Sequence, residues 1–216
     1  MAEFIRARSD EQKAQRLAQI KLAAERQFAT HSYHEITLTT IAEELSWSRA
    51  NLYKYVSTKE EIFLAITMDK RDAYMDGLVQ AFDSNQTFST KEIAQMWALL
   101  AKAHQDFFKY NSMLLNIIET NVSVEKLMVF KKTYHEKQDE LVSRLSPVFG
   151  IDETKVDRLT LGVMYHAEGL ACSCLNNPLI KEALKRIGRK PKAIDFQAEM
   201  EEFIYAYLEG YRNSLP

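Results

Sequence analysis

Apolar residues recur along most of this chain at the spacing that places them on one face of an α-helix. In the first such segment Leu17, Ile20, Ala24 and Phe28 follow one another at intervals of three or four residues, and residues 196–211 repeat the pattern. Gly and Pro are scarce, at six and four residues, and continuous β-branched runs are rare. The pattern predicts an all-α protein of about nine helices, with three short N-terminal helices followed by a larger C-terminal helical bundle.

Polar residues that cap helices predict where several of these helices begin. A Ser, Thr or Asp before an apolar periodic run accepts a hydrogen bond from a free backbone N–H of the first turn. Three of them are followed three residues later by Glu or Gln, which completes a capping box. We expect N-caps at Ser9, Thr37, Ser48, Thr58, Ser89 and Asp152.

The same rules predict how far the later helices extend. The helix after Thr58 is expected to reach Phe82, and the helix after Ser89 to carry one apolar stripe from Ile93 to Phe108. After these helices we expect a short helix around 113–120 and a long one that stops near Pro147 and Gly150. A further helix is expected from 152 to about 174. It is followed by a connection over 176–192 with one or two helical turns, and then by a last helix.

The segment between Thr37 and Lys59 has the pattern of a helix-turn-helix. Two short helices are interrupted by Ser46-Trp47, and apolar residues stand where the helices meet, at Ile41, Ala42, Leu45, Trp47 and Leu52. The second helix of such a unit enters the major groove of DNA and needs exposed donors for phosphates and base edges. These are present at Thr39, Ser48, Arg49, Asn51, Tyr53, Lys54 and Tyr55. We expect a DNA-binding domain over 1–60 and a second helical domain over 61–216.

The distribution of charge agrees with this division. The whole chain has a formal net charge of −2, so it has no general polycationic character. Residues 1–59 carry nine basic and seven acidic side chains, a net charge of +2, and the remainder carries −4. DNA binding is therefore expected to be a local property of one surface.

The stretch from Ile36 to Glu61, ITLTTIAEELSWSRANLYKYVSTKEE, resembles the DNA-binding segment of the TetR family. The shared features are a Thr-capped helix, an Ile-Ala pair, a Leu-Tyr-x-Tyr-Val recognition helix and a Lys-Glu helix start; Phe28 and Tyr33 upstream also match. The resemblance covers about the first 65 residues specifically. Ser46 stands where the family usually has a turn Gly, and Ala50 where Gly or Pro is frequent. A positive φ at Ser46 would strain the backbone modestly.

This resemblance implies roles for individual side chains. Thr37 and the start of its helix are expected to hold a phosphate, and Thr39 to reach a phosphate or base edge. Arg49 becomes the leading candidate for bidentate guanine recognition, with Asn51 beside it. Tyr53 and Lys59 resemble phosphate-binding residues, and Lys54 and Tyr55 are placed at the groove. Ser48 completes the DNA-binding set. Arg6 and Arg8 lie in a predicted disordered arm that adds phosphate or minor-groove contacts.

The second domain is expected to form a homodimer and to bind an effector, as the resemblance implies. The candidate dimer interface pairs a strip of small and aromatic residues with the last helix: Gly162, Tyr165, Gly169, Cys172, Phe203, Tyr207 and Tyr211. The alternative is that these residues only line the core of one subunit. Polar residues interrupting apolar stripes indicate a pocket for a small hydrophobic effector, lined by Trp97, His104, Phe107, Phe108, Met113, Ile117, Tyr134, Met164 and His166.

These features together predict a sequence-specific transcriptional regulator. Its expected partners are palindromic double-stranded operator DNA, a second copy and the effector, which would release a repressor; activation remains the alternative. We expect no catalytic residues, metal or cofactor, since no familiar catalytic or metal motif is present and Cys172 with Cys174 is too short for a zinc site. No signal peptide or transmembrane run occurs, so a cytoplasmic protein without a membrane partner is expected. The competing classes are a ligand-binding or partner-binding adaptor with little DNA function and, less favoured, an all-α enzyme.

Overall fold

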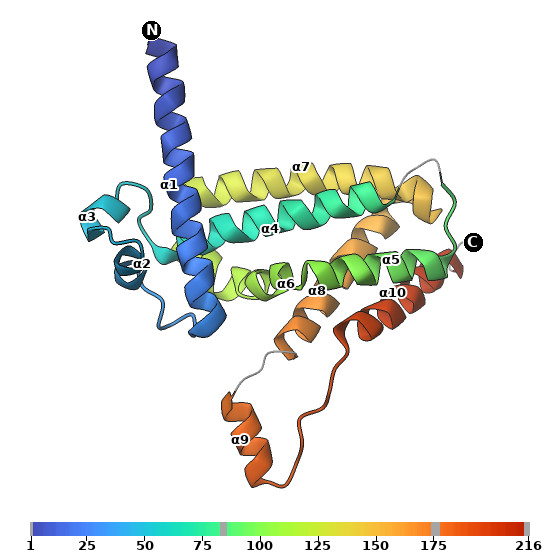
Figure 1. The fold of residues 1–216 in the computed structure, drawn as a ribbon. Coiled ribbons are helices and arrows are strands. Elements are labelled where there is room, and N and C mark those ends of the chain that lie inside the picture. Colours follow the sequence, from blue (N-terminus) through green and yellow to red (C-terminus); the bar gives the residue numbers. More distant parts are fainter. Residues whose placement is uncertain (1, 83–85, 174–177, 214–216) are drawn as a thin grey trace. The chain divides into compact units, whose positions relative to one another are not determined.

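The computed structural model describes residues 2–82, 86–173 and 178–213, and every regular element in these ranges is helical (Figure 1). For residues 2–9, 115, 178 and 179 only the backbone is described. The chain divides into two compact units, the first made of Met1–Asp69 and Met113–Phe130, and the second of Lys70–Ser112 and Lys131–Pro216. None of the described helices is both long and apolar enough to cross a membrane.

The first unit contains the N-terminal helices and a separate short segment. Its elements are α1 (Ala2–Thr30), α2 (Leu38–Glu44), α3 (Arg49–Leu52), the beginning of α4 (Lys59–Ala81), the π-helical turn Leu114–Ile118, the 3-10 turn Glu119–Asn121 and the beginning of α7 (Val124–Phe149). The domain boundary expected at residues 60 and 61 lies inside α4, whose residues belong to both units.

The second unit holds the remaining helices. They are α5 (Thr90–Ala103), α6 (Gln105–Asn111), α8 (Glu153–Ser173), α9 (Pro178–Arg186) and α10 (Phe196–Asn213), together with the later residues of α4 and α7. The described residues thus form ten α-helices where about nine were expected. The stripe from Ile93 to Phe108 is divided between α5 and α6, and α9 forms within the expected connection, whereas the short helix expected around 113–120 is a π-helical turn followed by a 3-10 turn.

The predicted caps Thr37, Ser48, Thr58 and Ser89 precede α2, α3, α4 and α5. Thr37 Oγ1 accepts from the Thr40 N–H at 3.1 Å, and Thr40 Oγ1 accepts from the Thr37 N–H at 3.1 Å. Ser48 accepts from the Asn51 N–H at 3.2 Å, and the expected Ser89 capping box is present. At α4, Thr58 accepts from the Glu61 N–H. The Glu61 carboxylate accepts from the Ser57 N–H, one residue earlier than a capping box requires.

Two boundary predictions were wrong. α1 begins at Ala2, so Ser9 lies inside the helix and is not its N-cap. The backbone of Arg6 and Arg8 is helical instead of forming a disordered arm. The capping motif did not stop the helix because the residues before it, AEFIRAR, are themselves good helix formers.

The single helix predicted across residues 90–108 breaks at His104. His104 adopts φ −105° and ψ 24°, outside helical geometry, and its carbonyl accepts from the Phe107 N–H at 2.9 Å to begin α6. The break gives the two halves different neighbours, since α5 packs along α10 and α6 packs against α8.

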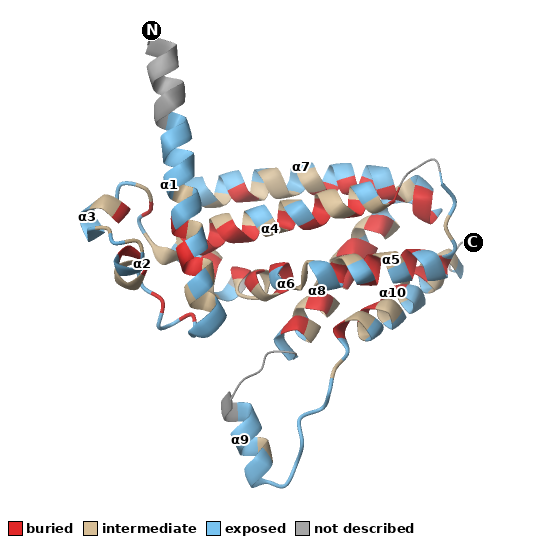
Figure 2. Cartoon of the chain, in the orientation of Figure 1, coloured by how far each residue is buried: buried red, intermediate tan, exposed pale blue. Residues whose placement is uncertain are grey.

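Aromatic side chains fill the core of the second unit. Trp97, Phe108 and Phe149 are fully buried. Along the helices of this unit, buried segments alternate with exposed ones (Figure 2). The indole N–H of Trp97 donates to the Tyr74 hydroxyl at 2.7 Å, which satisfies its polar atom inside the core. Burying such large apolar surfaces provides the main driving force for this packing.

Ser46 in the turn between α2 and α3 has a φ of 55°, the left-handed conformation in which glycine is usual. We expect Ser46→Gly to raise the free energy of unfolding of the first unit by about 0.5–1 kcal/mol, because relief of left-handed strain exceeds the added freedom of the unfolded chain. Chemical denaturation measures this change.

A matched control exists at Gly150, which has a φ of 64° and open space around the position of a Cβ. Gly150→Ala introduces the same strain without a steric clash and is expected to lower stability by about 1 kcal/mol. A loss of stability in Ser46→Gly would show that the Ser46 side chain makes a compensating contact.

Candidate DNA-binding site

The segment from Thr37 to Lys59 folds as two short helices joined by a turn, as predicted. Ile41, Ala42 and Leu52 are buried where α2 and α3 meet. Leu45 and Trp47 are half-buried. The apolar residues of the turn therefore fix the angle between the helices and leave the start of α3 facing solvent.

The candidate DNA-contact residues differ in exposure. Thr37, Ser48, Arg49, Tyr53 and Lys54 are exposed. Thr39, Asn51, Tyr55 and Lys59 are half-buried. The exposed set offers hydroxyl, guanidinium and ammonium donors from the N-cap of α2, from α3 and from the turns on either side of α3. Phosphates and base edges accept hydrogen bonds from such donors.

Arg49 at the first position of α3 is oriented by α2. One of its guanidinium nitrogens donates to the hydroxyl of Thr39. Thr39 thus limits the rotamers of a long, exposed side chain, which reduces the entropy lost when the guanidinium binds a partner. The structure therefore gives Thr39 a positioning role that the spacing alone did not reveal.

The two tyrosines after α3 lie in different environments. Tyr53 is 55% exposed, whereas Tyr55 is half-buried with its ring centroid 5.9 Å from that of Trp47. The guanidinium of Arg16 from α1 lies over the Trp47 ring at 5.1 Å. Tyr53 is consequently the tyrosine available for a phosphate, and Tyr55 also supports the turn.

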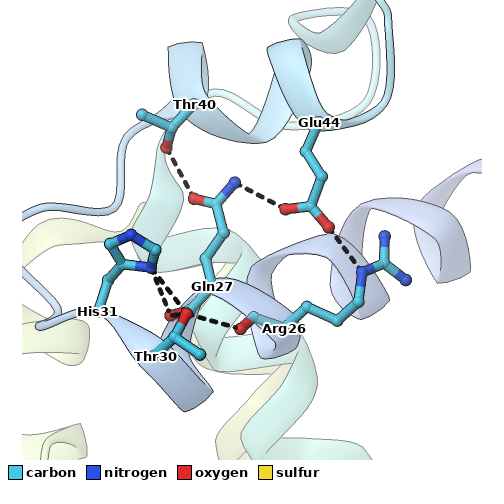
Figure 3. Close-up of polar contacts among 6 residues, drawn as sticks. All are labelled: Arg26, Gln27, Thr30, His31, Thr40 and Glu44. Atoms are coloured by element: carbon cyan, nitrogen blue, oxygen red, sulfur yellow. Dashed lines mark hydrogen bonds and ion pairs between the residues drawn. The ribbon is translucent and has the colours of Figure 1, made fainter.

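A network of polar side chains fastens α2 to the end of α1 (Figure 3). The Glu44 carboxylate accepts from Arg26 at 2.6 Å and from Gln27 at 2.8 Å. Thr40 donates to the amide oxygen of Gln27 at 2.7 Å, so Gln27 bridges both ends of α2. These residues hold the helix that carries Thr39. Sequence reasoning missed them because partners 13 to 18 positions apart leave no periodic signal.

Lys59 lies inside the first unit instead of pointing freely to solvent. Its ammonium group donates to the carbonyls of Tyr33 at 2.8 Å and Ile36 at 2.9 Å, and lies 4.0 Å from the centroid of the Tyr33 ring. Burial lowers the pKa of Lys59, and Glu60 opposes this effect. The Tyr33 hydroxyl donates to Glu60 at 2.6 Å. Lys59 therefore joins the turn before α2 to the first turn of α4, which uses two of its three donors within the protein.

The residues predicted to line an effector pocket are distributed over both units. Met113 and Ile117 belong to the first unit, and the others to the second. Trp97, Phe107 and Phe108 are buried within the packed core. Tyr134 is half-buried, and burial raises its pKa. Met164 contacts Asn111, whose amide donates to Glu168 at 2.5 Å, and burial raises the pKa of Glu168.

His166 on α8 stacks on Phe203 of α10, with ring centroids 3.9 Å apart and planes within 7°. Its Nε2 atom is buried and lacks a hydrogen-bond partner among the described residues. Burial lowers the pKa of His166 from its ordinary value of 6.5, and Glu199 opposes this effect. Burial also lowers the pKa of His104, assisted by the charge of Lys70.

Because the pKa values of these two histidines are lowered in the folded protein, we expect the free energy of unfolding of the second unit to fall in mild acid. Below pH 6.5 the unfolded chain binds protons that the folded imidazoles resist, so stability falls as pH decreases toward the folded pKa values and then levels off. His166→Phe keeps the stacking on Phe203 and removes one titrating group. Denaturation midpoints between pH 7 and pH 5 should fall less in this variant; a fall as steep as in the unmodified protein would contradict the prediction.

The residues predicted to form a dimer interface separate into two groups. Gly162 packs against Tyr207 of the same chain, because a Cβ at Gly162 would lie 2.2 Å from the Tyr207 ring. Phe203, Tyr207 and Tyr211 contact one another in series, and the first stacks on His166. By contrast, Tyr165 is 60% exposed, and Gly169 and Cys172 are exposed. Cys174 lies outside the described residues.

Comparison with known proteins agrees with this fold and this helix-turn-helix. The family described as "Bacterial regulatory proteins, tetR family" matches residues 20–66, and "Tetracyclin repressor-like, C-terminal domain" matches residues 68–214. The chain is therefore a helix-turn-helix DNA-binding transcriptional regulator. It belongs to the TetR family.

Two individual relatives extend over most of the chain. The HTH-type transcriptional activator FasR of Mycolicibacterium smegmatis (strain ATCC 700084 / mc(2)155) is 24% identical over 174 residues, which cover 78% of this chain and 77% of that protein. A TetR/AcrR-family transcriptional regulator from Thermobifida fusca YX-ER1 has a similar fold, with a TM-score of 0.53 and 20% identity over 92% of this chain and 99% of that one.

Proposed function

We propose that this regulator binds an inverted-repeat operator as a homodimer and reads it with the start of α3. The observation that carries this proposal is the exposed guanidinium of Arg49, held by Thr39 at the first position of the recognition helix. Two recognition helices of a dimer meet successive major grooves about 34 Å apart, so the operator repeats one half-site per helical turn.

The other candidate residues divide into positioning and reading roles. Tyr53, Lys54 and Thr37 contact phosphates, because they are exposed around the two short helices. Asn51 and Ser48 lie at the start of α3 beside Arg49 and supply further polar contacts to the groove. Phosphate contacts set affinity for any duplex, whereas base contacts set the preferred sequence.

Arg49→Ala is expected to relax the base preference at one position of each half-site, by about 1–3 kcal/mol, because a bidentate contact to guanine is lost. Selection from random duplexes, followed by binding measurements at several salt concentrations, checks this result. Thr39→Val serves as a companion variant: it keeps the charge of Arg49 but removes its hydroxyl partner, and should relax the same position more weakly. Selection that returns no inverted repeat would contradict the proposal.

We further propose that a small hydrophobic effector bound by the second unit controls operator binding. α4 contains residues of both units, so a ligand that favours one arrangement of the second unit would bias the DNA-binding unit through this helix. Such a ligand changes the equilibrium only by its difference in affinity for the two states. Titration of an operator complex with candidate ligands, read by anisotropy, tests the coupling.

This proposal has two forms, which differ in whether the regulator represses or activates transcription. Repression released by the effector is our preferred form. Activation is the second candidate, favoured by the relative from Mycolicibacterium smegmatis, which is described as a transcriptional activator. Deleting the gene and measuring transcripts beside each bound operator separates them, since transcripts rise if the protein represses and fall if it activates. A protein that binds no duplex at low salt would instead be an adaptor.

A further inference from the structure

α9 is a short helix whose C-terminal end is sharply defined. Pro178 occupies its first position, where a missing N–H is tolerated. At the other end Gly188 has a φ of 67°, its N–H donates to the Lys185 carbonyl at 3.1 Å, and the Arg189 N–H donates to the Leu184 carbonyl at 2.8 Å. These two bonds form a Schellman motif, which ends the helix at a defined point.

From Ile180 onward, almost all side chains of α9 and the following segment are exposed to solvent. From Ile180 to Ala193 every residue is exposed except Leu184, which is half-buried (Figure 2). Ile180 is 56% exposed and Ile187 is 69% exposed. An isolated helix of nine residues is marginal in water, so packing on an apolar surface would stabilise α9.

One face of α9 is apolar and its surroundings are basic. Ile180 and Leu184 lie four residues apart on one face of α9, and Ile187, three residues further in the turn just after the helix, continues the same spacing. Residues 178–192 carry a net charge of +5 in a chain whose total is −2. The single acid, Glu182, is two positions from Leu184, away from the apolar stripe, and pairs with Arg186 at 2.9 Å.

A groove of the opposite character runs between α5 and α10. It has a volume of about 550 Å³ and is lined by Lys91, Ala94, Ala198, Glu201, Glu202 and Tyr205. A second hollow of about 280 Å³ adjoins it at Glu201 and includes the side chains of Met96 and Leu99. Leu99 is 60% exposed and Tyr205 is 46% exposed. α10 carries four glutamates and one arginine, so the groove offers apolar surface beside carboxylates.

We propose that α9 of one subunit docks in the α5–α10 groove of a second copy of this chain. Both surfaces belong to the second unit, they match in apolar character and in opposite charge, and the side chains from Ile180 to Ala193, apart from Leu184, are exposed within one chain. In a twofold dimer each subunit places its α9 in the groove of the other, so the contact occurs twice. The exposed apolar residues of α9 and of the groove are then covered in both subunits. This inference rests on the proposed homodimer and adds to it a reciprocal contact outside the faces of Tyr165 and Gly169.

Charge reversal on each side tests this contact. One variant carries Lys181→Glu and Lys185→Glu on α9, and the other carries Glu201→Lys and Glu202→Lys on the groove. Each is expected to weaken its own dimer roughly tenfold or more, because every reversed pair acts twice. Lys126→Glu with Lys132→Glu, exposed on α7, makes the same charge change as the α9 variant and should leave dimerisation unaltered. Sedimentation measures the dissociation constants, and thermal unfolding confirms that each variant folds.

Mixing the two variants identifies the occupant of the groove. In a mixed dimer, acidic α9 meets the basic groove and basic α9 meets the acidic groove, so the mixture should regain the affinity of the unmodified protein. Differently labelled chains report formation of this mixed dimer.

Three results would overturn the inference. If both variants dimerise normally, the groove does not bind α9 of a second copy. If a chain that carries all four changes recovers the thermal stability of the unmodified protein, but a mixture of the two variants does not recover dimer affinity, α9 docks in its own chain. If the unmodified protein is monomeric at micromolar concentration, the proposed homodimer is wrong. This result is obtained before any variant is made, so it is distinct from a failure of the α9 contact.

Discussion

Replacing Lys59 with methionine should lower the free energy of unfolding of the first unit by about 1.5–3 kcal/mol without changing the salt dependence of operator binding. The ammonium group of Lys59 donates to two backbone carbonyls, of Tyr33 and Ile36, both in buried residues. Methionine keeps the length of the side chain but leaves these carbonyls without their charged donor. Denaturation of the variant measures the loss directly.

The salt dependence separates this structural role from the phosphate contact that the family resemblance implied. A lysine that neutralises one phosphate contributes about 0.9 to the slope of log affinity against log salt concentration. Lys54, exposed after α3, provides the control. Lys54→Ala should flatten the slope by about one unit per subunit and leave stability unchanged, whereas Lys59→Met should do the reverse. A flattened slope with normal stability in Lys59→Met would return Lys59 to the phosphate-binding set.

Gly162→Ala should destabilise the second unit by about 1–3 kcal/mol, because α8 and α10 pack too closely at this point for a Cβ. The added carbon would lie 2.2 Å from Cε1 of Tyr207. Tyr207 has little freedom to move aside, since its ring contacts Phe203 and Tyr211 on either side and its hydroxyl accepts from that of Tyr211 at 3.3 Å. Thermal or chemical unfolding reports the change.

Gly169 on the same helix supplies the matched control. A Cβ there meets nothing within 4 Å in one chain, so Gly169→Ala should raise stability by about 0.5–1 kcal/mol through helix propensity alone. Gly162→Ala combined with Tyr207→Ala should recover most of the clash energy, which a double-mutant cycle measures. If Gly162→Ala is as stable as Gly169→Ala, the close approach of the two helices is wrong.

Residues whose roles depend on local spacing could be predicted from the sequence. The Thr37 and Ser48 caps and the buried Ile41 and Ala42 follow from rules that span four residues or fewer. These rules were sufficient for the helix-turn-helix and for the all-α fold, because a short amphipathic helix is specified almost entirely by its own residues.

Features that depend on distant partners could not be predicted in the same way. The phosphate role of Lys59 is a prediction from the family resemblance, and nothing local indicates that the carbonyls of Tyr33 and Ile36 approach its ammonium group. The small-residue strip was treated as one surface, yet Gly162 faces Tyr207, 45 positions later, while Gly169 faces away. The break at His104 was missed because the apolar stripe continues through it in helical register, although the backbone does not.

The break at His104 allows the two successive helices α5 and α6 to pack against different partners. α5 adjusts to α10, and α6 adjusts to α8, with a single non-helical residue between them. In a continuous rod, any shift of one end would be transmitted to the other. Here the angle between α5 and α6 is set by the φ and ψ of one residue, His104, instead of by a continuous ladder of helical hydrogen bonds. The two dihedral angles of His104 therefore decide how the α5–α10 contact is placed relative to the α6–α8 contact, and α8, which packs on both α6 and α10, ties the two contacts together.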